Sequence, residues 1–208
     1  MKQIVRCFIN NKAFESCLMV VIDDKEVTNY KKINNVCVLY HENHIIGYNI
    51  IDETFKTFSN GYHPVHELLE KINESLQRVS LDPIEADLEN RFKVGKVIEC
   101  EEHPESDHLH ICQVDIGNEV LQIVCGAHNV EKGIQVVVAC ENAIMPNGNL
   151  ITAGKLRGVD SYGMLCSEYE LGLIKEHKKG LLILDDTYQV GESFKGGHKK
   201  CLNGLKNY

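Results

Sequence analysis

The apolar residues of this chain lie in short runs separated by polar turns, and this pattern constrains the fold more than any other feature. Runs of about four to eight residues that are rich in β-branched side chains predict strands. Before residue 60 such runs occupy residues 4–9, 17–22, 36–40 and 45–51. After residue 90 they occupy residues 92–100, 109–116, 120–125, 134–139 and 181–184. We therefore expect a mainly β protein.

One segment breaks the strand pattern and predicts a helix. From residue 64 to residue 79 the apolar side chains recur at helical spacing and form a single stripe: Val65, Leu68, Leu69, Ile72, Leu76 and Val79. Pro64 suits the first turn of such a helix. Four strands followed by this helix predict a small α+β domain over residues 1–88, which ends in an acidic, Pro83-containing stretch.

The strands after this boundary predict a second domain over residues 89–196. Five short strands joined by loops suit a small closed barrel, and residues 126–130 are short enough for one helical turn. Residues 197–208 combine glycines with lysines and are expected to form a C-terminal tail.

The charge and cysteine content narrow the functional classes. The net charge is −8, and residues 91–208 hold 13 Lys and Arg against 16 Asp and Glu. A nucleic-acid site on this chain must therefore be a local basic patch, with modest and salt-sensitive affinity. The nine cysteines form no Cys-x-x-Cys pair and sit in apolar runs, which indicates buried free thiols in a reducing compartment. With no apolar run long enough for a membrane span, we expect a cytoplasmic protein.

Three segments of the second domain carry a family resemblance. They are residues 103–109 (His-Pro-Glu-Ser-Asp-His-Leu), residues 123–130 (Ile-Val-Cys-Gly-Ala-His-Asn-Val) and residues 155–167 (Lys-Leu-Arg-Gly-Val-Asp-Ser-Tyr-Gly-Met-Leu-Cys-Ser). In this order they resemble the tRNA-binding OB-fold domain of the phenylalanyl-tRNA synthetase β subunit and of endothelial monocyte-activating polypeptide II. An acidic α+β domain in front of such a module resembles the free-standing bacterial tRNA-binding proteins of the YtpR type.

The resemblance implies an OB-fold that binds tRNA as its partner, with no cofactor and no metal. Lys155 and Arg157 alternate around Leu156, so we expect both to contact phosphates from one strand face while Leu156 enters the core. Six further side chains complete the expected RNA-binding set: Ser161, Met164, Asn129, His128, Lys96 and Lys178. For Asn129, capping of a turn is the competing interpretation.

The sequence also departs from the family pattern. His108 stands where the family usually has a basic residue, and His128 stands where it usually has proline. Histidine is mostly neutral at pH 7, so the site loses charge at His108. Aromatic residues are few in this domain, which favours recognition of folded RNA shape over stacking of several bases.

Residues of the same domain also allow a metal-site and a thiol-nucleophile interpretation. His103, His108, His110 and Asp107 cluster in sequence, but nothing supplies the matched second half of a zinc site. Cys125 or Cys166 with His128 as base would suit acyl chemistry.

Three functions follow from these alternatives. The first is a non-catalytic tRNA-binding protein, the second a hydrolase of aminoacyl-tRNA that uses the barrel as a substrate handle, and the third a protein-interaction module. A protein partner is expected to dock on residues 1–88, and the sequence leaves a homodimer open.

Overall fold

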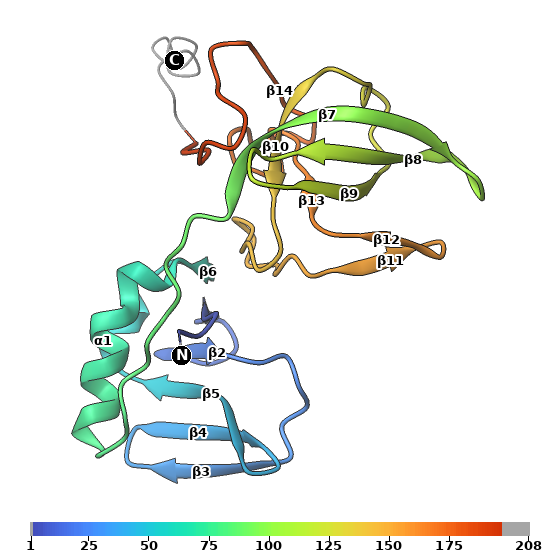
Figure 1. Cartoon of the computed structure of the whole chain (residues 1–208). Helices are drawn as coiled ribbons and strands as arrows, with labels where there is room; N and C mark the ends of the chain where they lie inside the picture. Colours follow the sequence, from blue (N-terminus) through green and yellow to red (C-terminus); the bar gives the residue numbers. More distant parts are fainter. Residues whose placement is uncertain (1, 197–208) are drawn as a thin grey trace, which may run out of the picture. The chain divides into compact units, whose positions relative to one another are not determined.

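The computed structural model describes residues 2–196 of the chain, which fold mainly into antiparallel β-sheets (Figure 1). The chain divides into two compact units, Met1–Glu89 and Asn90–Tyr208, and each is described by itself. The expected tail at residues 197–208 lies outside the described residues. Within residues 2–196 no helix is long and apolar enough to cross a membrane.

The N-terminal unit is one six-stranded antiparallel sheet with a helix. Its strand order is β3-β4-β5-β2-β1-β6. The strands are β1 (Arg6–Ile9), β2 (Cys17–Val21), β3 (Asn29–Ile33), β4 (Val36–His41), β5 (His44–Ile51) and β6 (Gly61–His63). A 3-10 helix, η1 (Glu53–Thr57), and the helix α1 (Val65–Arg78) complete the unit.

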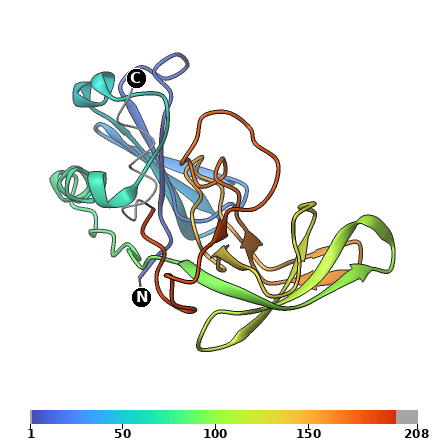
Figure 2. The same cartoon turned by 90° about the horizontal axis from the view of Figure 1, so that it is seen from above.

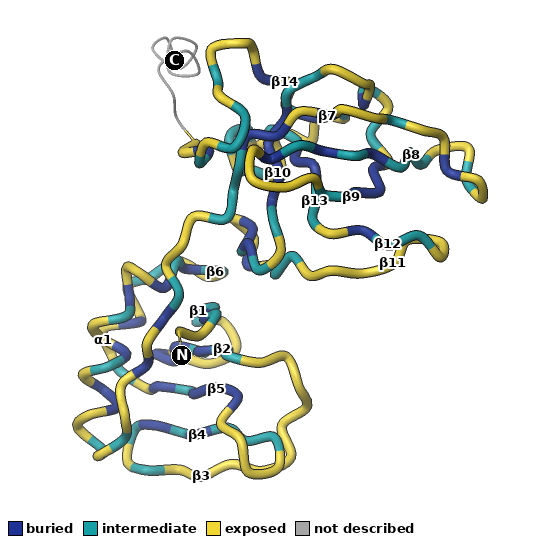
Figure 3. The backbone as a smooth tube through the Cα atoms, viewed as in Figure 1, coloured by how far each residue is buried: buried dark blue, intermediate teal, exposed yellow. Residues whose placement is uncertain are grey.

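The helix α1 forms where its apolar stripe predicts it. Pro64 is its N-cap residue, and Val65, Leu68, Ile72 and Leu76 are buried in one core with side chains from β1, β2, β4 and β5. An amphipathic helix of this kind is stable mainly because its apolar face packs against the rest of the core. The helix therefore covers one face of the sheet, and the predicted α+β arrangement is confirmed (Figure 3).

The prediction of four strands in this unit is wrong, because β3 and β6 are also strands. β3 carries Tyr30, Lys31 and Lys32, all exposed, and it pairs with β4 alone. Lysines on an edge strand hinder its pairing with other chains. They also leave no alternation of apolar and polar residues from which the sequence could predict the strand. β6 spans only three residues, too few for a pattern.

The C-terminal unit is the expected barrel. Its sheet has the order β13-β10-β7-β8-β9, with β14 paired to β10. The strands are β7 (Phe92–His103), β8 (Ser106–Asp115), β9 (Val120–Cys125), β10 (Gln135–Ala139), β13 (Met164–Leu165) and β14 (Ile183–Leu184). A separate two-stranded hairpin consists of β11 (Gly154–Leu156) and β12 (Val159–Ser161).

The segment at residues 159–165 closes the sheet. The amide of Tyr162 donates to the Gln122 carbonyl on β9 at 2.9 Å, while Leu165 pairs with Val138 on β10. Gly163 lies between these contacts with φ +131°, and a Cβ on it would stand 2.8 Å from the Ala139 carbonyl oxygen. A side chain at this position would clash with that carbonyl oxygen, so only glycine fits there.

The barrel core is built from the inward residues of five strands. Val97, Val114, Ile123 and Val136 are fully buried in it, together with Leu165 from the closing segment. The long β7–β8 hairpin extends past this core, and the β11–β12 hairpin extends beside it (Figures 1 and 2). These two hairpins carry four of the predicted RNA-binding residues, Lys96, Lys155, Arg157 and Ser161.

Candidate nucleic-acid interface

The β11–β12 hairpin carries Lys155 and Arg157, but not on one strand face. Arg157 and Gly158 form the turn between the two strands, with φ of +44° and +85°. Both central residues of such a two-residue turn have positive φ, so the strand alternation stops at Leu156. The expectation that Leu156 enters the core is wrong: its side chain is 41% exposed, because this hairpin stands outside the barrel sheet.

The hairpin tip is tied to the turn between β7 and β8. The Arg157 guanidinium Nη1 donates to the Glu105 carbonyl at 3.3 Å, and His103 Nε2 lies 3.3 Å from the Leu156 carbonyl. Lys155 Nζ lies 3.4 Å from the Asp160 carboxylate, its cross-strand neighbour. An exposed ion pair of this kind contributes little, so a phosphate can replace the carboxylate.

Ser161 belongs to the barrel rather than to its surface. The residue is buried, and its Oγ accepts from the Val124 amide at 3.1 Å. The same hydroxyl lies 3.5 Å from the Gly163 carbonyl. These bonds hold β12 against β9, so Ser161 supports the closing segment, and its contact with RNA stays a prediction.

A groove on the barrel unit brings together three of the predicted residues, His128, Met164 and Lys178. Its volume is about 570 Å³. It lies between the end of β9, the strand β13 and the loop before residue 181. The lining residues are His108, Val124, Cys125, Gly126, Ala127, His128, Met164, Leu165, Ser167, Glu170, His177, Lys178, Lys179, Gly180 and Leu181. We call this the barrel groove.

The rim of the barrel groove is richer in basic side chains than the chain as a whole. His108, His128, His177, Lys178 and Lys179 are exposed there. The one carboxylate among the lining residues is that of Glu170, which accepts from the Ser167 amide at 2.8 Å and from its hydroxyl at 2.6 Å. Lys178 Nζ lies 3.3 Å from the Glu168 carboxylate. The lining of the groove is therefore locally more basic than acidic, on a chain whose net charge is −8.

Asn129 holds the two walls of the barrel groove together. Its Oδ1 accepts from the Leu181 amide at 2.8 Å, and its Nδ2 donates to the Leu181 carbonyl at 3.2 Å. Gly180 packs against this amide with φ +103°, and a Cβ on it would stand 3.0 Å from the Asn129 Oδ1. The side chain does not cap its own turn but clamps residues 177–181 beside His128.

The sequence names three groove residues for the site, His128, Met164 and Lys178. The short basic run that contains His177 and Lys179 precedes the last predicted strand and could widen a phosphate-binding patch, although such runs usually mark a solvated loop. His108 is visible as a departure from the family pattern. Lys96 is exposed on β7, opposite Gln135 and Asp115, and is not among the residues that line the groove.

The thiols of this unit are poorly suited to nucleophilic catalysis. Burial raises the pKa of Cys125, which lines the groove, and raises the pKa of Cys166 to about 12. A thiol is a nucleophile only as its thiolate, and burial disfavours that form. These cysteines therefore serve as small apolar core residues.

In the histidine cluster of the β7–β8 turn, both ring nitrogens of His103 have partners. The Nδ1 of His103 accepts from the Glu105 amide at 3.1 Å, while its Nε2 faces the Leu156 carbonyl. Across residues 2–196 no group of three or more His, Cys, Asp or Glu side chains is arranged to hold a metal ion.

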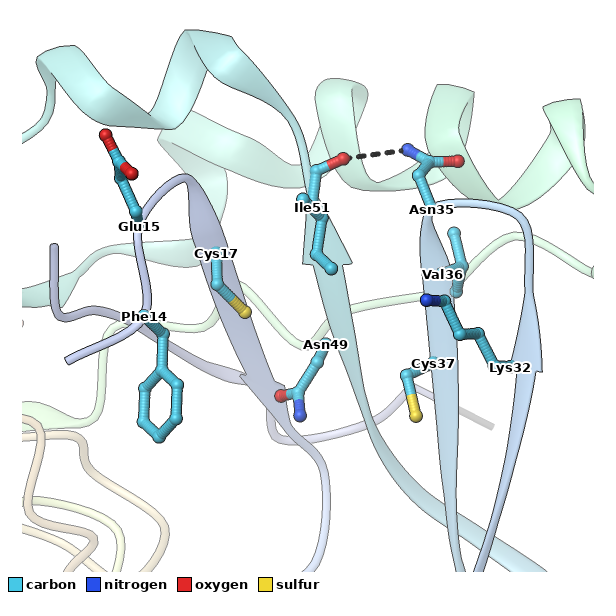
Figure 4. Close-up of a pocket in the computed structure, with 9 residues that line it drawn as sticks. All are labelled: Phe14, Glu15, Cys17, Lys32, Asn35, Val36, Cys37, Asn49 and Ile51. Atoms are coloured by element: carbon cyan, nitrogen blue, oxygen red, sulfur yellow. Dashed lines mark hydrogen bonds between the residues drawn. The ribbon is translucent and has the colours of Figure 1, made fainter.

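The N-terminal unit has a shallow pocket of its own, on the uncovered face of its sheet (Figure 4). Its volume is about 360 Å³, and Phe14, Cys17, Cys37 and Ile51 contribute to its lining. Phe14 is 56% exposed and Ile51 47%. The docking of a protein partner on residues 1–88 stays a prediction, and this pocket is the first place to test it.

The comparisons with known proteins identify the family of this chain. The family model described as "Putative tRNA binding domain" matches residues 92–193. The chain is 35% identical over 199 residues to "Putative tRNA-binding protein YtpR" of Bacillus subtilis, an alignment that covers 91% of this chain and 99% of the relative. It is 56% identical over 98 residues to the phenylalanine–tRNA ligase β subunit of Campylobacter jejuni, which covers 47% of this chain and 12% of the ligase subunit.

A solved structure aligns with about the same share of the chain. The crystal structure of a MetRS-related protein from Pyrococcus horikoshii is 24% identical and has a TM-score of 0.38, covering 50% of this chain and 88% of the other. The alignment with YtpR spans both units, and the ligase alignment is confined to a domain-sized segment. Both confirm the resemblance carried by the three sequence segments. This chain belongs to the YtpR family of proteins with a C-terminal tRNA-binding domain.

Proposed function

We propose that the chain binds folded tRNA without transforming it, and that the barrel unit holds the RNA through its backbone phosphates. The observation that carries this proposal is the barrel groove, where three histidines and two lysines line a hollow that contains one carboxylate. Phosphate contacts from such side chains position a nucleic acid without reading its sequence.

The hairpin extends the proposed contact surface. Lys155 and Arg157 stand at a tip that is tied to the β7–β8 turn, and His108 follows that turn on β8. At the other end of the hairpin, Ser161 bonds to Val124, which lines the groove. The proposed interface therefore runs from the hairpin tip along β8 and β9 into the groove.

Shape recognition fits this surface better than base stacking. Among the residues that line the groove the only rings are those of His108, His128 and His177, and the floor is aliphatic. Double-stranded RNA is recognised mostly through its phosphates and hydroxyls. We therefore expect similar affinities for different tRNAs.

The experiment is a salt titration of tRNA affinity with the full chain. Each phosphate contact contributes roughly 0.7–0.9 to the slope of log affinity against log salt. The variant Lys178→Ala/Lys179→Ala should lower the slope by about 1.5. The matched control is Lys31→Ala/Lys32→Ala on β3, which removes the same charge from the exposed edge of the other unit. Equal losses in both variants would contradict the groove as the site.

A catalytic role on aminoacyl-tRNA has less support than binding. The acyl chemistry expected of a thiol would need a thiolate in the groove, and burial raises the pKa of the one thiol there, Cys125. On incubation of the protein with aminoacyl-tRNA at pH 7, the ester should be lost no faster than it is without the protein.

We also infer a cytoplasmic location, since the eight cysteines among the described residues are free thiols.

A further inference from the structure

Three of the five basic side chains at the barrel groove are histidines. They come from three separate parts of the chain: His108 from β8, His128 from the loop after β9, and His177 from the loop before residue 181. All three are exposed, and their rings are available to a ligand in the groove. Histidine is the side chain that changes charge between about pH 5 and 8.

We propose that the barrel groove binds one phosphate-bearing nucleotide of the tRNA on this histidine rim, and that binding takes up protons and tightens as the pH falls. This inference rests on the proposed tRNA binding and adds the ligand unit and its dependence on pH. The negative phosphate favours the charged form of each imidazole that it contacts, so protonation and binding stabilise each other.

The floor of the groove suits the rest of a nucleotide. Val124, Met164, Leu165 and Leu181 form an aliphatic surface beneath the basic rim. A volume of about 570 Å³ lies within the range of roughly 300–1,000 Å³ that is typical of small-ligand sites. The ribose of a nucleotide can therefore rest on this floor while its phosphate meets the rim.

The other charged groups around the rim do not replace the histidines. The other charged side chains that line the same groove are those of Lys178, Lys179 and Glu170. The Glu170 carboxylate is already bonded to Ser167, and Glu168 pairs with Lys178. Asp107 and Glu176 adjoin His108 and His177 in the sequence, Cys125 lines the groove with a pKa raised by burial, and the ring of Tyr169 lies 5.1 Å from that of His177. The incoming phosphate is thus the main new charge that the imidazoles meet.

The expected effect is large enough to measure. Each imidazole that becomes protonated on binding changes the logarithm of the affinity by up to about one for each pH unit in the range where the free ring is neutral. With even one histidine coupled in this way, the affinity should rise about tenfold between pH 8 and pH 6. The salt slope should also be steeper at pH 6, by roughly 0.7–0.9 for each charged histidine that contacts a phosphate.

The test measures tRNA affinity of the full chain at pH 6, 7 and 8 and constant ionic strength. The wild type should show the tenfold change, and the variant His108→Gln/His128→Gln/His177→Gln should bind with nearly the same affinity at all three values. The matched control is His41→Gln/His44→Gln/His66→Gln in the N-terminal unit, which should behave as the wild type and corrects for titration of the RNA itself. Circular dichroism of both variants checks that they fold.

The outcomes separate this inference from the proposed function. A wild type that binds tRNA equally well at pH 6 and pH 8, or a triple groove variant that keeps the pH dependence, would overturn the histidine rim while leaving tRNA binding intact. A wild type that binds no tRNA at any pH would overturn both. A second probe, adenosine monophosphate against adenosine and inorganic phosphate, locates the nucleotide: NMR shifts of Met164 should respond to the monophosphate and not to phosphate alone.

Discussion

The clamp made by Asn129 gives a prediction that can be worked out from the structure. Asn129→Ala removes two hydrogen bonds to the backbone of Leu181, a residue that is 9% exposed. A hydrogen bond of this type contributes about 0.5–1.5 kcal/mol net, so local opening of this segment should become easier by about 1–3 kcal/mol. That difference corresponds to an increase of roughly 5- to 150-fold in the opening equilibrium.

Native-state hydrogen exchange of the Leu181 amide measures this opening directly. The neighbouring Leu182 amide, which donates to the Cys166 carbonyl at 3.0 Å, serves as an internal reference and should change less. The control variant is Asn118→Ala, an exposed asparagine whose side chain lies 3.5 Å from the Glu119 carboxylate.

The same variant should also weaken tRNA binding, because the bonds of Asn129 to Leu181 anchor the end of the loop that carries His177 and Lys178. Unchanged exchange at Leu181 in Asn129→Ala would refute the clamp. Faster exchange with unchanged tRNA affinity would show that the rim does not depend on it.

Three further predictions concern the hairpin, the closing segment and the buried thiols. Lys155→Ala/Arg157→Ala should lower the salt slope of tRNA binding by about 1.5 with little loss of stability, and an unchanged slope would move the RNA away from the hairpin. In urea unfolding, Gly163→Ala should cost more than Gly158→Ala, whose added Cβ meets only open space and costs about 1–2 kcal/mol for its positive φ. Because burial raises the pKa of Cys166 from 9.0 to about 12, stability should fall as the pH rises above about 9, and Cys166→Ala should lose part of this decline.

The sequence predicts those parts of the fold in which one face of an element is buried. The helix α1 and strands such as β9 (Val120–Cys125) follow from the spacing of their apolar residues, since a buried face imposes that spacing. β3 could not be found in this way because its residues face solvent on both sides of an edge. The β11–β12 hairpin lies in a glycine-rich stretch whose local pattern resembles a loop.

The candidate site could be predicted from the sequence only in part. His128, Met164 and Lys178 were each visible as separate residues, but the groove that joins them depends on contacts between residues about 50 positions apart, such as Asn129 with Leu181. No local pattern encodes such a contact. The prediction that Lys155 and Arg157 share one strand face is wrong for a related reason. A turn at Arg157 and Gly158 interrupts the strand alternation, and the positive φ of Arg157 is visible only in the structure.

The most direct test of tRNA binding by the barrel groove is a map of backbone amide shifts of the full chain on addition of tRNA. The changes should concentrate at residues 126–129, at residues 164–167 and at residues 177–181, with a second group at residues 155–158. They should weaken together as salt is raised, because phosphate contacts carry the binding. Shifts confined to residues 1–89, with the groove amides unmoved at saturating tRNA, would contradict the account.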